Sequence, residues 1–258
     1  MRSGQDVLIT ECAPGFFDGE NIPDDYLPLL PIYHIFPMHL TPQHLGDNIH
    51  RPRMWCIMAN RNTMIVDVPI SKGLLLKCLG RRCDLPVECM FRAPLDVVRD
   101  MVEKMAEVAR VPSTWGFRSL LNGTHRGRLD TYERKVAEME TKGKIADSDF
   151  VILDLDHNSD ARPRIGVSRL FSLCCHFQLW LCKLDRVGHV FEALECHGFP
   201  VWQCKEGTTL SPFRKLFTDT VGRESDMSWQ CMVGNSQHVP TYGAVLCFAL
   251  ACVRRRGK

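Results

Sequence analysis

The last stretch of the chain is the feature that most restricts the fold. Residues 241–254 have the length of one helix and are apolar nearly all round, until Arg254-Arg255-Arg256 ends the run. A helix of this kind has to be buried. A chain of 258 residues is long enough to form a sheet on which the helix can pack. No run approaches the roughly 18 apolar residues of a membrane span, so we expect none.

Other segments carry the signals of short strands and helices. Strands are indicated at 6–10, 32–40, 53–60 and 150–155, where apolar residues lie between turn residues. Helices are indicated at 95–111, 129–144 and 190–194.

Charge and cysteine content restrict the functional classes. The chain has 32 Lys and Arg against 30 Asp and Glu, so any basic surface that binds nucleic acid must be local. The 13 cysteines follow an N-terminus without the apolar core of a signal peptide, so we expect reduced thiols inside a cell. Their spacing lacks the pairs typical of zinc sites, and we predict no metal.

Two charged motifs lie at the ends of expected strands. Glu11 follows the first strand, and a carboxylate at the carboxyl end of a strand lies where open α/β sheets bind ligands. It could hydrogen-bond or protonate a ring nitrogen. Arg51 and Arg53 flank Pro52 at the start of 53–60, and their guanidinium groups suit phosphate oxygens or a carboxylate. Taken alone, a solvated glutamate and an exposed arginine pair are the alternatives.

Two further motifs mark helix ends. Gly198-Phe199-Pro200 stops the helix at 190–194, with Phe199 as a buried anchor. Gly234-Asn235-Ser236 precedes the final helix, where free N–H groups and a polar cap could hold a carboxylate. In isolation, each motif also fits an ordinary helix end.

In their order and spacing these motifs resemble the second half of the cytosine-5 DNA methyltransferases. The resemblance covers 6–60 and 187–254 and rests on Glu11, Arg51, Arg53, Glu192, Gly198, Phe199, Pro200, Gly234 and Asn235. The chain departs from the family at Cys12-Ala13, Ile49 and Glu195, where the family has Asn-Val, Gln and Arg. It also lacks the family's Phe-x-Gly-x-Gly cofactor loop and its Pro-Cys nucleophile, since no cysteine follows a proline.

The resemblance implies a fold. Residues 1–61 and 185–258 would form the C-terminal part of an α/β, Rossmann-like S-adenosylmethionine-dependent methyltransferase domain. Its partial sheet would end in an antiparallel hairpin of 32–40 and 53–60, with the final helix packed on it. Residues 62–184 would form a smaller, irregular α+β target-recognition domain.

The resemblance also implies a reaction, methyl transfer from S-adenosylmethionine to C5 of cytosine in DNA. The catalytic residues would be Glu11, which holds N3 of a flipped cytosine, with Arg51 and Arg53 bracing it. Cofactor contacts would come from Gly234, Asn235 and Ser236. DNA contacts would come from the basic residues of 126–135, unless these form a solvated helix face: Arg126, Arg128, Arg134 and Lys135.

Without the nucleophile, we expect the chain to be inactive alone. It would be part of a longer gene product, a subunit whose partner chain carries the first half, or a degenerate relative; in a eukaryote it would be nuclear. Two alternatives share the sequence features. One is a non-catalytic nucleic-acid-binding or regulatory module, and the other is a relative of the tRNA cytosine-5 methyltransferases.

Overall fold

The computed structural model describes residues 5–13, 22, 24–83, 85–201 and 226–257. The chain forms two compact units. The first unit comprises Met1–Asp84 and His238–Lys258, and the second comprises Leu85–Gln237. Within the described residues, no helix is long and apolar enough to cross a membrane.

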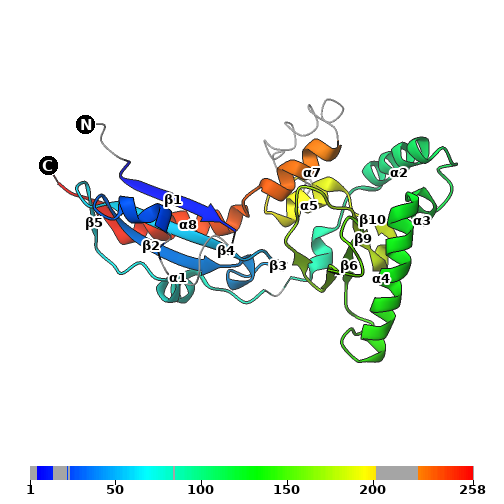
Figure 1. Ribbon diagram of the computed structural model, residues 1–258, viewed down its shortest axis with the longest axis horizontal. Helices are drawn as coiled ribbons and strands as arrows, with labels where there is room; N and C mark the ends of the chain where they lie inside the picture. Colours follow the sequence, from blue (N-terminus) through cyan, green and yellow to red (C-terminus); the bar gives the residue numbers. More distant parts are fainter. Residues whose placement is uncertain (1–4, 14–21, 23, 84, 202–225, 258) are drawn as a thin grey trace, which may run out of the picture. The chain divides into compact units, whose positions relative to one another are not determined.

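A three-stranded sheet forms the centre of the first unit (Figure 1). Its order is β1 (Val7–Cys12), β4 (Arg53–Asn60) and β2 (Tyr33–Leu40), and β4 runs antiparallel to both neighbours. The predicted pairing of 32–40 with 53–60 is therefore confirmed. Because β1 and β2 run parallel to each other, their carboxyl ends lie at the same edge of the sheet.

The final helix packs on one face of this sheet, as predicted. Helix α8 (Val239–Cys252) buries Val245 and Phe248 in one core with Trp55 and Ile57 of β4. Its opposite face remains open, with apolar side chains such as Leu250 exposed, so burial is one-sided despite the apolar sequence. After the helix the chain becomes extended, and β11 (Val253–Arg255) pairs with β5 (Met64–Val66).

Smaller elements complete the first unit. The 3-10 helix η2 (Asp24–Leu29) covers the other face of the sheet, next to Cys56 and Met58. Between β2 and β4 lie η3 (Pro42–His44) and β3 (Ile49–His50). Helix α1 (Lys72–Leu79) adds Leu75 to the core beneath α8.

The second unit is built on a four-stranded antiparallel sheet. Its order is β10 (Arg186–Val187), β9 (Leu179–Leu181), β6 (Val151–Asp154) and β7 (Ile165–Val167). Helix α4 (Gly123–Thr141) packs on it through Leu129 and Tyr132, with α2 (Leu95–Ala109) and α3 (Phe117–Leu120) alongside (Figure 1). The remaining elements are η4 (Val87–Met90), β8 (Leu170–Phe171), η5 (Cys182–Leu184), α5 (Val190–Cys196) and α7 (Asp226–Asn235).

The architecture is thus mixed α/β with small open sheets. The units divide at 84/85 and 237/238, whereas the divisions predicted from the sequence were at 61/62 and 184/185. Packing explains the difference. Residues 62–84 join the first core through β5 and α1, whereas α5 contacts α7 through the rings of Phe191 and Trp229, 5.3 Å apart.

Candidate functional site

An ion pair lies at the carboxyl edge of β1. Glu11 is opposite Trp55 in the sheet register, and Arg53 lies two residues before Trp55, so Glu11 and Arg53 are diagonal neighbours on one face. Arg53 Nε is 3.2 Å from Glu11 Oε1, and only 18% and 11% of the two side chains is exposed. Arg53 Nη1 also donates to the carbonyl of Pro52. The structure thus brings together two of the three predicted catalytic residues.

Arg51, the third, lies beside a buried histidine that was not among the predicted site residues. Arg51 is 3% exposed and His238 is 3% exposed. Burial, reinforced by the charge of Arg51, lowers the pKa of His238 to about 4. The imidazole is therefore neutral near pH 7, and the charge at this position belongs to Arg51.

His238 caps the final helix. Its Nδ1 accepts a hydrogen bond from the backbone N–H of Thr241 and lies 2.8 Å from the Thr241 hydroxyl. The ring proton is then on Nε2, which is 3.8 Å from Asp47 Oδ2. Burial raises the pKa of Asp47. A histidine directly before Val-Pro at a helix start was the sequence signal that could have revealed this cap.

The arrangement provides two kinds of chemistry at one edge of the sheet. A half-buried carboxylate can accept a hydrogen bond from a ring N–H or share a proton with a ring nitrogen. Arginine beside it can bind an anionic oxygen or hold the carboxylate in place. With Glu11 and Arg53 already paired, the guanidinium acts first as an orienting group for the carboxylate.

Gly234-Asn235-Ser236 does not begin a helix, so that prediction is wrong. Gly234 and Asn235 end α7 in the second unit, and the N-cap of α8 is His238. A Cβ on Gly234 would lie 2.3 Å from the carbonyl oxygen of Cys174, so glycine is required by close packing. Asn235 Oδ1 accepts from the Cys175 thiol, and Ser236 donates its hydroxyl proton to a carbonyl at the helix end. These groups bond within the second unit.

The Gly-Phe-Pro motif does stop a helix, as predicted. Helix α5 ends at Cys196, and Gly198 follows with φ of +82° and donates to the carbonyl of Glu195. Phe199 is half-buried rather than a fully buried anchor, and Pro200 is exposed.

Within α5, the motif residue Glu192 is fully buried. Nη1 and Nη2 of Arg186 both donate to its carboxylate, at 2.9 and 2.7 Å. The backbone N–H groups of Ala93 and His189 donate to it as well. Glu192 therefore has a structural role in the second unit.

The four basic residues predicted to contact DNA lie on α4, and three of them donate to backbone carbonyls. Arg126 donates to Ser119 and Leu121. Arg128 and Lys135 donate to Leu155 and Ser159, respectively. Arg134 is exposed and donates to the hydroxyl of Thr131. These contacts favour a structural helix face over a surface arranged for phosphates.

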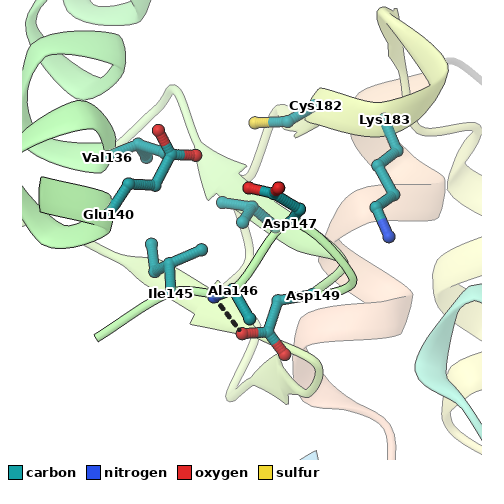
Figure 2. A pocket seen from close by; sticks show the side chains of 9 residues that line it. Val136, Glu140, Ile145, Ala146, Asp147, Asp149, Cys182 and Lys183 are labelled. Atoms are coloured by element: carbon teal, nitrogen blue, oxygen red, sulfur yellow. Dashed lines mark hydrogen bonds between the residues drawn. The ribbon is translucent and has the colours of Figure 1, made fainter. Parts of the chain in front are cut away.

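A hollow of about 190 Å³ opens beside α4 and β6, and none of the predicted site residues lines it (Figure 2). Its carboxylates come from Glu140, Asp147 and Asp149. Asp149 accepts from the backbone N–H of Ala146 and from the Ser168 hydroxyl, which lowers its pKa. Burial raises the pKa of the Cys182 thiol to about 12, so this sulfur is no nucleophile at neutral pH.

Comparison with known proteins adds no assignment. No protein-family model matches the chain, and no curated protein matches it. Across the described ranges, no three His, Cys, Asp or Glu side chains are grouped so as to hold a metal ion. Function is therefore inferred from the residues and their geometry.

Proposed function

We propose that this chain is the C-terminal portion of a DNA cytosine-5 methyltransferase-like protein and provides the side chains that hold the target cytosine. The observation that carries the proposal is the Glu11–Arg53 pair at the carboxyl edge of β1. In the proposed reaction, Glu11 bonds to N3 of a cytosine flipped out of DNA, and Arg53 fixes the orientation of the carboxylate.

The arrangement of the first unit supports this proposal. The antiparallel pair β2–β4 and the returning helix α8 are the features expected at the end of a Rossmann-like methyltransferase sheet. In the proposal, β1, β2 and β4 are the part of that sheet carried by this chain. The second unit supplies the target-recognition lobe.

The residues present do not fit S-adenosylmethionine. Asn235 and Ser236 bond within the second unit, and the Gly-rich cofactor loop is absent from the sequence. No cysteine follows a proline, so the nucleophile motif is absent as well. We therefore assign cofactor binding and the covalent step to a chain that carries the missing motifs, and expect no methyl transfer by these 258 residues alone.

Two measurements test the proposal. The purified chain with labelled S-adenosylmethionine and DNA should release no methylated product, and clear turnover would overturn the assigned division of labour. The second measures binding to duplexes with an unpaired cytosine or an unpaired thymine. Cytosine should bind about tenfold more tightly, because its N3 accepts a proton whereas N3 of thymine carries one.

The matched variants are Glu11→Ala and Glu88→Ala, since Glu88 is an exposed glutamate of the second unit. Glu11→Ala removes the group that bonds to N3 and should abolish the preference for cytosine, whereas Glu88→Ala should preserve it. Binding that falls steeply with salt but never discriminates the two bases would favour the non-catalytic nucleic-acid-binding module instead. Tighter binding of RNA than DNA would favour the tRNA methyltransferase alternative.

A further inference from the structure

A cysteine with two basic neighbours lies in the second unit. Cys174 is exposed, and Arg164 Nη2 donates to its sulfur at 3.3 Å. The same sulfur is 4.0 Å from Nε2 of His157. A guanidinium group at this distance stabilises a thiolate, which is the form of cysteine that reacts with electrophiles.

Arg164 is fixed in this position by contacts of its own. Its Nη1 donates to the carbonyl of Ser172 at 2.8 Å, and its guanidinium carbon lies 6.0 Å from the centre of the Phe171 ring. The nitrogen that faces Cys174 is therefore held in place before any reaction begins.

A buried carboxylate completes the group. Asp154 is fully buried, and its Oδ2 accepts no hydrogen bond from the residues that the structure describes. This oxygen lies 3.9 Å from His157 Nε2 and 3.8 Å from Arg164 Nη1, the two side chains that also reach Cys174. Arg164 and His157 thus each lie close to both the Asp154 carboxylate and the Cys174 sulfur.

We propose that Cys174 is a site of oxidation by hydroperoxides, at which the protein forms a sulfenic acid. The thiolate attacks one peroxide oxygen, so that an S–O bond forms as the O–O bond breaks. The sulfur is oxidised by two electrons, and the departing hydroxide or alkoxide takes up a proton from solvent and leaves as water or as an alcohol. Two equivalents of a small thiol can return the sulfenic acid to the thiol, with release of water and a disulfide. This inference does not depend on the proposed methyltransferase function.

Two other exposed cysteines provide internal controls. Cys89 and Cys247 are exposed as Cys174 is, and across the described residues neither sulfur has an arginine or histidine as a hydrogen-bond partner. The purified full-length chain is treated with limiting hydrogen peroxide and dimedone, which traps sulfenic acids, and the labelled cysteines are quantified by peptide mass spectrometry. Cys174 should be labelled about tenfold faster than either control. Equal labelling of the three would overturn the proposal.

Substitutions then test the role of Arg164. Arg164→Gln should lower the labelling rate of Cys174 to that of Cys89, whereas Arg162→Gln, which changes an exposed arginine nearby, should leave it unchanged. Circular dichroism establishes that each variant folds. If Arg164→Gln proves unfolded, the comparison of the three cysteines in the unaltered chain still decides the question. A folded Arg164→Gln protein with unaltered labelling of Cys174 would refute the proposed site.

Discussion

Replacing Glu192 by glutamine should destabilise the second unit more than the same replacement at Glu195, the other charged residue of α5. The Glu192 carboxylate is fully buried and accepts four hydrogen bonds, two from Arg186 and two from backbone N–H groups. A glutamine retains one acceptor oxygen but turns an NH₂ group toward donors. It also leaves the guanidinium of Arg186, 10% exposed, without its counter-charge.

The expected cost is about 3–5 kcal/mol, the range for breaking a buried ion pair by removing one partner. Glu195→Gln is the matched control on the same helix. Glu195 pairs with Arg92, whose side chain is 43% exposed, so screening by solvent should limit the loss to about 1 kcal/mol or less.

Hydrogen exchange of α5 peptides in increasing urea is the appropriate assay, because it follows the second unit separately from the first. The double variant Arg186→Met with Glu192→Met should recover part of the lost stability, since it removes both charges together but leaves the N–H groups of Ala93 and His189 without this acceptor. The reasoning would be refuted if Glu192→Gln cost no more than Glu195→Gln, because the buried network would then contribute little.

Two further predictions concern His238 and Gly234. Because the folded pKa of His238 is about 4, below the ordinary value of 6.5, the unfolded chain takes up the proton first as the pH falls. The free energy of unfolding of the first unit should therefore fall by about 3 kcal/mol between pH 6.5 and 4. Above pH 6.5, His238 should make no pH-dependent contribution to it. Urea titrations at a series of pH values should show this loss in the unaltered chain and in His50→Gln, an exposed control, but a shallower slope in His238→Gln. Gly234→Ala should destabilise the packing of α7 by about 1–3 kcal/mol, because its methyl group would meet a carbonyl oxygen. Gly243→Ala, where the added methyl group meets nothing within 4 Å, should be neutral or stabilising in the same thermal melts.

Elements with strong local signals could be predicted from sequence. The strand expected at 53–60 is β4 to the residue, and the one expected at 32–40 is β2 with one residue fewer. Both have apolar residues on each face, a pattern that is typical of a strand covered on both sides. The start of α4 was missed by six residues, although Asn122 caps it by accepting from His125 N–H, a preference that is readable in sequence.

Motifs whose meaning depends on distant contacts could not be predicted in this way. Glycine and asparagine are favoured just after a helix as well as before one, so Gly234-Asn235 is locally ambiguous. The close approach of Gly234 to the Cys174 carbonyl decides between the two, and it comes from a segment far away in sequence. In the same way, the sequence around Arg128 and Lys135 does not indicate that their charged groups donate to backbone carbonyls in the segment after β6.

The candidate site depends both on local sequence signals and on contacts between distant segments. Sequence motifs singled out Glu11 and Arg53 separately, but their pairing depends on the register of β1 against β4. Successive side chains on a strand alternate between faces, so a slip of one residue would place the two charges on opposite sides of the sheet. The register is set by the apolar residues of β1 and β4 that α8 covers, among them Ile9 and Ile57. The geometry of the charged pair is therefore a consequence of how the core packs, and substitutions in that core should alter the site without touching either charge.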